Sequence, residues 1–159
     1  MSYDMQDFEN IVQDLVRSIQ LLLSGTSGQF QLDQKERTHE ASLKIKSQLP
    51  NRAPIEIVVE EDFGAYLTVG KGSVFEIRLN SVEPGGQTGF SQKVLATIEA
   101  VIKNGFEEKV LVSRGIILGA SGLIRASGPL KADLKESWRK IPWNIFAKKT
   151  WEHHVYLPY

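Results

Sequence analysis

The spacing of apolar residues predicts an amphipathic helix at the start of the chain. Eight apolar side chains recur every three or four residues, the period of one helix face: Phe8, Ile11, Val12, Leu15, Val16, Ile19, Leu22 and Leu23. Ser2 or Asp4 can cap the first turn, and Ser24-Gly25 can end the last one. We therefore expect a helix over residues 4–24 whose apolar face packs on the rest of the protein.

The stretch that follows supports two interpretations. Residues 25–33 resemble a flexible connection, because they are rich in small and polar residues. Within 36–49, Ala41, Ile45 and Leu49 have helical four-residue spacing, and Glu40 and Lys44 are placed for an i,i+4 ion pair. Leu43-Lys44-Ile45-Lys46 also alternates as a strand does. We favour a helix that ends at Pro50, with a strand as the alternative.

The central block, residues 55–126, has the clearest pattern. It begins with three stretches rich in β-branched and alternating residues, which predict an antiparallel meander: 55–59, 66–69 and 74–79. An acidic turn at 60–64 and a tight turn at Gly70-Lys71-Gly72 connect them. After an expected loop over 84–89, a helix is predicted over 91–103, with Ser91 as its N-cap and Asn104-Gly105 as its stop.

Short strands are expected after this second helix, at 109–113, 115–118 and 123–126. The last segment, 127–159, differs in character. It includes a predicted short helix over 133–140 and all three tryptophans, Trp138, Trp143 and Trp151. These elements predict one α+β domain over 1–159, in which an antiparallel sheet of about five to six strands packs against an N-terminal amphipathic helix and a central helix.

Composition sets the class of protein. The chain has 159 residues, of which 42% are hydrophobic and 24% charged, as in ordinary globular proteins. It has no cysteine, no apolar run long enough to cross a bilayer and no basic leader of the signal-peptide type. We therefore expect a cytoplasmic address, with no membrane partner. The net charge is zero, which disfavours a strongly basic nucleic-acid binder, although residues 1–40 are acidic and 127–159 basic.

Motifs that advertise catalysis are weak. Gly70-Lys71-Gly72-Ser73 lacks the spacing of a phosphate-binding loop and is better explained as a hairpin turn. The glycine-rich loop at 85–89 lacks a dinucleotide fingerprint. Adjacent His153 and His154 point to opposite faces of a strand and cannot easily chelate one ion. We expect no catalytic residue, cofactor or metal.

Two surfaces are candidates for binding a partner. The first is the acidic turn Glu60-Glu61-Asp62, which can be solvated, present charge to a basic protein, or bind metal or catalyse. The second is the aromatic and basic tail that contains Trp138, Arg139 and Trp143. These residue types close cores, stack on single-stranded nucleic acid and dominate protein interfaces.

One pattern of helix end, turn and hairpin in the sequence resembles a known group of proteins. Asn104-Gly105-Phe106-Glu107-Glu108 ends a helix and leads directly into a hairpin with Arg114-Gly115. Over residues 55–126 this is similar to small bacterial α+β immunity proteins of polymorphic and contact-dependent toxin systems. The resemblance assigns no functional residue, but it implies an inhibitor that binds and blocks a cognate toxin. The alternatives are single-stranded nucleic-acid binding through the tail, or an enzyme of unrecognised type.

Overall fold

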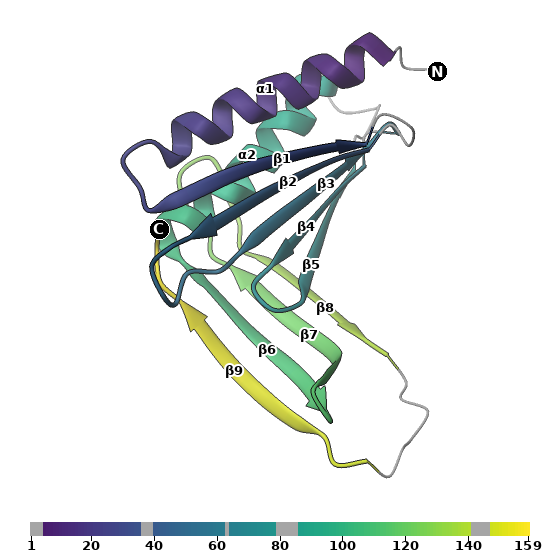
Figure 1. The fold of residues 1–159 in the computed structure, drawn as a ribbon, viewed down its shortest axis with the longest axis vertical. Helices are drawn as coiled ribbons and strands as arrows, with labels where there is room; N and C mark the ends of the chain where they lie inside the picture. The colour runs from purple at the N-terminus through teal and green to yellow at the C-terminus, as the bar shows by residue number, and fades with distance from the viewer. Residues whose placement is uncertain (1–4, 36–39, 63, 79–85, 141–146) are drawn as a thin grey trace.

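The computed structural model describes residues 5–35, 40–62, 64–78, 86–140 and 147–159 (Figure 1). The described residues form two helices and nine strands, in the order α1 (Met5–Leu23), β1 (Gly28–Lys35), β2 (Glu40–Ser47), β3 (Ile55–Glu60), β4 (Gly64–Val69), β5 (Ser73–Arg78), α2 (Gly86–Asn104), β6 (Phe106–Ser113), β7 (Ile116–Ile124), β8 (Leu134–Arg139) and β9 (Thr150–Tyr156).

The strands form two antiparallel sheets. The first sheet is a meander with the order β1-β2-β3-β4-β5, and the second has the order β8-β7-β6-β9. The predicted α+β class and its two helices are confirmed. The described strands, however, divide into two sheets, where the sequence led us to expect one sheet of about five to six strands.

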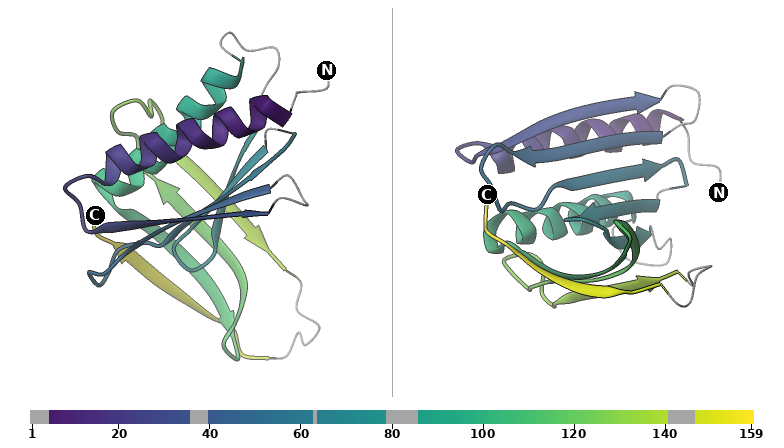
Figure 2. Two further views of the ribbon diagram at one scale, coloured as in Figure 1. Left: turned by 45° about the horizontal axis from the view of Figure 1, so that its top comes forward. Right: turned by 60° about the horizontal axis from the view of Figure 1, so that its bottom comes forward.

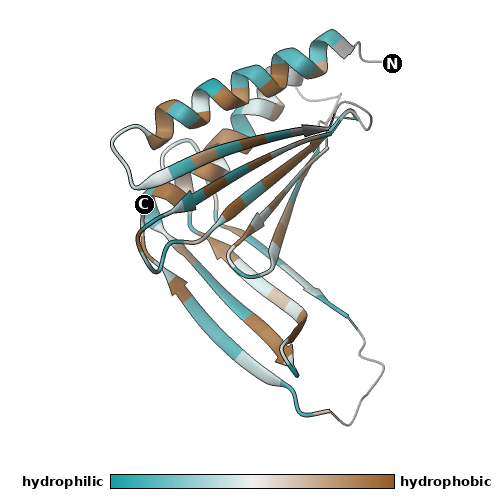
Figure 3. Cartoon of the chain, viewed as in Figure 1, coloured by the Kyte–Doolittle hydropathy of each residue, from teal (hydrophilic) through white to brown (hydrophobic). Residues whose placement is uncertain are grey.

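Both helices lie over one face of the first sheet (Figure 2). α1 contacts α2 and β1, whereas α2 also contacts β5 and β7 and so fills the corner between the two sheets. The predicted stripe of α1 is largely buried, with Leu15 and Ile19 fully enclosed. Apolar and polar residues alternate along the strands beneath it (Figure 3). Each large apolar side chain buried in this way contributes about 1.5–3 kcal/mol.

The predicted helix ends are confirmed, but one predicted start is wrong. Gly25 and Gly105 have φ of +79° and +77°, the left-handed conformation of a helix stop. α2 begins at Gly86, so Ser91 lies inside the helix and residues 86–89 are not loop. Phe90 is only 2% exposed. Its burial in the core gives a physical reason for the helix to extend upstream of the N-cap that we predicted.

The segment after α1 is a hairpin: the expected flexible connection and the favoured helix are wrong, and the alternative interpretation as a strand is confirmed for residues 40–47. The expected flexible connection contains strand β1, and the favoured helix over 36–49 is strand β2, with residues 36–39 outside the described part. Leu43 and Ile45 are fully buried against the helices, whereas Lys44 faces outward. The Lys44 ammonium lies 3.4 Å from the Glu56 carboxylate on β3, an ion pair across strands instead of along a helix.

The predicted helix over 133–140 is also wrong, because this segment contains strand β8. β8 pairs with β7 and forms one edge of the second sheet. Its register places Leu134, Glu136 and Trp138 on the face toward the first sheet, and Lys135 and Arg139 on the opposite face. In a strand, alternate residues point to opposite faces, so the inner-face and outer-face residues of β8 separate; a helix would not separate them in this way.

The two sheets meet at a buried carboxylate, that of Glu108 on β6. Glu108 is 1% exposed and accepts three hydrogen bonds, from the Lys71 backbone N–H at 2.6 Å, the Ser73 hydroxyl at 2.7 Å and the Tyr156 hydroxyl at 2.8 Å. A carboxylate accepts hydrogen bonds and donates none, so three converging donors suit it. We call Glu108, its three partners and the Gly70–Ser73 turn the sheet junction.

The junction is closely packed. A Cβ added to Gly70, whose φ is +73°, would lie 2.4 Å from a Glu108 carboxylate oxygen. A Cβ on Gly122 would lie 2.6 Å from the Ser73 Cβ. Burial and the adjacent Glu108 carboxylate raise the pKa of Tyr156, which keeps its hydroxyl protonated as a donor. The tight turn predicted at Gly70-Lys71-Gly72 is therefore the part of the first sheet that packs against Glu108 of the second sheet.

The C-terminal residues tie this arrangement to the helices. The Leu157 N–H donates to the Asn51 carbonyl at 2.7 Å, and the Tyr159 N–H donates to the Ile102 carbonyl at the end of α2 at 2.9 Å. Burial raises the pKa of Tyr159 to about 12, and its hydroxyl donates to the Ala53 carbonyl.

No helix among the described residues is both long and apolar enough to span a membrane.

Truncation of the junction carboxylate should destabilise the fold. Glu108→Ala leaves buried donors without an acceptor, so the free energy of unfolding in urea should fall by roughly 3 kcal/mol. Glu108→Gln should cost less, because the Ser73 hydroxyl can rotate to accept a hydrogen bond. The control is Glu107→Ala, which removes a half-exposed neighbour on the opposite face and should cost under about 1 kcal/mol. Equal losses from Glu107→Ala and Glu108→Ala would contradict this role.

Candidate functional site

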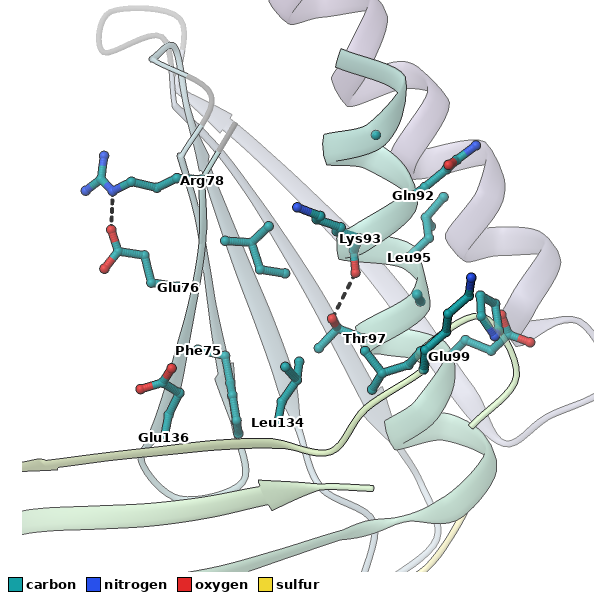
Figure 4. A pocket seen from close by; sticks show the side chains of 16 residues that line it. Phe75, Glu76, Arg78, Gln92, Lys93, Leu95, Thr97, Glu99, Leu134 and Glu136 are labelled. Atoms are coloured by element: carbon teal, nitrogen blue, oxygen red, sulfur yellow. Dashed lines mark hydrogen bonds and ion pairs between the residues drawn. The ribbon is translucent and has the colours of Figure 1, made fainter. Parts of the chain in front are cut away.

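A groove opens where the two sheets and α2 diverge. Its volume is about 890 Å³. One wall is the outer edge of β5, the second is α2, and β8 with the turn before it forms the base (Figure 4). Beyond the lining residues at one end, next to the sheet junction, the Trp138 indole N–H on β8 donates to the Gly72 carbonyl beside β5 at 2.7 Å; we call this the closed end of the groove. The junction therefore fixes how close the two walls lie.

The lining combines apolar side chains with charged ones. Apolar surface comes from all three walls: Phe75 and Ile77 on β5, Leu95 and Ala96 on α2, Leu130 and Leu134 at the base. Charged residues also border it: Lys93 and Glu99 on α2, Lys131 and Glu136 at the base, and Glu76 and Arg78 on β5. The side chains of Glu76 and Arg78 point away from α2 (Figure 4). Arg78 forms an ion pair with Glu76 that is visible in Figure 4. An apolar centre with a polar rim is the usual anatomy of a protein interface.

β5 is the last strand of the first sheet. It pairs with β4 from Arg78 to Ser73, and within the described part of the chain no strand pairs with its other edge. Such an edge presents unpaired backbone N–H and C=O groups, which can form hydrogen bonds with another extended chain. The groove thus places free backbone hydrogen-bonding groups beside apolar surface.

The acidic turn predicted as a binding site lies at the open end of β5. The Asp62 carboxylate is 3.4 Å from the Arg78 guanidinium, and it also accepts the Gly64 backbone N–H at 3.0 Å. Arg78 in turn donates to the Tyr66 hydroxyl. Asp62 therefore shapes the turn and holds Arg78, whereas Glu60 at the end of β3 and Glu61 in the turn are not among the residues that line the groove.

The structure separates the residues of the aromatic tail. Trp138 is half-buried at the closed end of the groove, with the Lys140 ammonium 5.8 Å from its ring centre. Arg139 is exposed on the opposite face of the second sheet. Trp143 lies outside the described residues. Trp138 and the acidic turn therefore stand at opposite ends of β5.

The histidine prediction is confirmed in geometry. His153 faces outward and lies 2.8 Å from the Glu107 carboxylate, whereas His154 lies on the other face, 3.1 Å from Glu152. The hydrogen bond from His154 and the nearby Lys71 ammonium lower the pKa of Glu152. No group of three or more His, Asp or Glu side chains in the described ranges is placed to hold a metal ion.

Sequence reasoning missed the groove and the role of Glu108. The strand that the sequence predicts here begins only at 109, so it assigns neither Glu107 nor Glu108 to a face of the sheet. β6 begins at Phe106, and adjacent strand residues point to opposite faces. A pattern signal did exist: Phe106, Glu108 and Val110 alternate as buried positions. The groove has no sequence signal, because the residues that line it are spread from 75 to 136 and come together only in the folded protein.

Comparison with known proteins adds no relative. No family model, curated protein or solved structure matches the chain. The function must therefore be argued from this chain's own geometry.

Removal of the Trp138 indole N–H should weaken the closed end of the groove. Trp138→Phe leaves the Gly72 carbonyl without its donor, so we expect the free energy of unfolding to fall by about 1–2 kcal/mol. Trp151→Phe is the matched control, because Trp151 is 55% exposed. It should change stability by less than about 0.5 kcal/mol. If both variants behave alike in urea titrations, the Trp138 contact does not hold this end together.

Proposed function

We propose that the protein is a protein-binding module, and that its groove receives an extended segment of a partner protein beside β5. One observation carries this proposal: the free edge of β5 borders a groove with apolar residues on every wall. An added strand would form main-chain hydrogen bonds with β5, while its alternate side chains enter the groove. The volume is also in the range of sites that enclose a ligand, about 300–1,000 Å³.

The distribution of charge supports a protein partner. The charged residues of the groove have both signs, with Glu99 and Lys93 on α2 and Glu136 and Lys131 at the base. A mixed rim suits the varied side chains of a polypeptide better than a uniformly charged ligand. The acidic turn with Glu60, Glu61 and Asp62 lies beyond Arg78, which Asp62 contacts, and there it can attract a basic partner.

The resemblance to immunity proteins suggests a more specific version of this proposal. In that version the partner is a toxin domain, and binding at the groove and the acidic turn blocks its active site. Co-expression with a toxin encoded beside this gene should then protect cells, and Glu61→Lys should slow association. Persistent toxicity would reject the immunity role and leave the broader binding proposal standing.

The binding proposal can be tested with a phage-displayed library of random 12-residue peptides. A selected peptide should lose at least tenfold in affinity for Ala96→Leu, because the larger side chain occupies the groove. Gln20→Leu, on the exposed side of α1, adds the same side chain elsewhere and should bind normally. Binding is measured by titration calorimetry, and urea titrations confirm that both variants fold.

Hydrogen exchange shows whether the peptide adds as a strand. A bound peptide should slow exchange of β5 backbone amides and leave those of β1, the opposite edge of the first sheet, unchanged. A library that yields no binder, a binder insensitive to Ala96→Leu, or a complex without β5 protection would each overturn the proposal.

A further inference from the structure

The outer face of the second sheet is a second surface, on the side of the sheet opposite the groove. The register aligns residues on this face in rows across the strands. One row contains Ser137, Ser121, Lys109 and His153, and the next contains Arg139, Gly119, Leu111 and Trp151. The groove lies on the other side, because Leu134, Glu136 and Trp138 alternate with these residues along β8.

Small residues form the middle of this face and long ones its borders. Gly119, Ser121 and Ser137 occupy neighbouring positions on β7 and β8. Lys135 and Arg139 stand on either side of Ser137, and Lys109 lies across β7 on β6. Because the side chains between the cationic residues are small, an extended chain could lie flat on this part of the sheet.

The face has an excess of positive charge. Lys109, Lys135 and Arg139 are exposed, and among the described residues none of the three forms an ion pair. The acidic side chain of the face, Glu107, is already shared between His153 at 2.8 Å and Arg125 at 3.9 Å. The three cations are therefore available to an anionic partner.

An exposed aromatic ring lies beside these charges. Trp151 is 55% exposed and borders a hollow of about 410 Å³ together with Lys109, Ser121, Glu152 and His153. The Glu152 carboxylate is paired with Lys71 and His154, so it leaves the charge of Lys109 available. Trp151 thus differs from Trp138, which is held against the Gly72 carbonyl on the inner face. A tryptophan ring next to cations is the combination that stacks a base and neutralises its phosphate.

We infer that this outer face binds single-stranded nucleic acid, with Trp151 stacking on a base and Lys109, Lys135 and Arg139 contacting phosphates. An acidic protein would pair with the cations, whereas a base that stacks on the ring brings its own phosphate to the neighbouring cations. A duplex presents its bases already stacked, so it could not use Trp151. The proposal is independent of the groove and of the partner proposed for it.

The test is fluorescence anisotropy with a labelled 20-residue oligothymidylate. With three phosphate contacts, the logarithm of the association constant should fall with the logarithm of salt concentration, with a slope of about −2. Trp151→Ala should weaken binding on the order of tenfold. Arg139→Glu and Lys109→Glu should each weaken it and reduce the slope by roughly 0.7.

Matched controls separate this face from charge in general. Lys46→Glu makes the same charge change at an exposed position on β2 of the first sheet and should bind like wild type. Ala96→Leu, which fills the groove, should also bind normally. The proposal is overturned by absence of binding at low salt, or by equal loss in Lys46→Glu. It also fails if duplex or polyglutamate competes equally and Trp151→Ala has no effect, which would indicate a general anion-binding surface.

Discussion

The buried carboxylate of Glu108 determines how the two sheets of this protein meet. Its three donors come from both sheets: Lys71 in the turn before β5, Ser73 at the start of β5, and Tyr156 on β9. A buried charge without partners would cost several kcal/mol, so the turn at Gly70–Ser73 must stay against the second sheet. That contact sets the position of the start of β5 relative to β6 and β9, and with it the end from which β5 and β8 diverge.

The groove is a consequence of this constraint. The sheets are held together at one end by Glu108 and by the Trp138 contact with Gly72, and they diverge toward Arg78. α2 fills part of the resulting corner and leaves the edge of β5 uncovered by any described strand. A structural requirement of the fold thus produces the surface that we propose for partner binding.

The sequence indicated the fold where one periodicity dominates and misled where two coexist. The stripe of α1 and the alternation of β3 and β5 predicted their elements correctly. β2 contains both periods, and only contact with the helices selects the strand, because Leu43 and Ile45 then reach the core. The sequence of β8 taken alone predicts a helix. The strand is stabilised by backbone pairing with β7, which forms only in the folded protein.

The candidate sites were less predictable for the same reason. Sequence proximity grouped Trp138 with Arg139, and Glu107 with Glu108, whereas strand geometry places the members of each pair on opposite faces. The same sorting gives the second sheet two different surfaces. Its inner face contains the junction and one wall of the groove, and its outer face presents Trp151 and unpaired cations.

Native-state amide hydrogen exchange of Glu108→Gln tests the central claim most directly. If Glu108 fixes the angle between the sheets, exchange should accelerate in the Gly70–Ser73 turn, β5 and β8, while α1 and β1 to β3 keep wild-type rates. Uniform acceleration across the chain, or unchanged rates at β5 and β8, would show that the groove does not depend on this carboxylate.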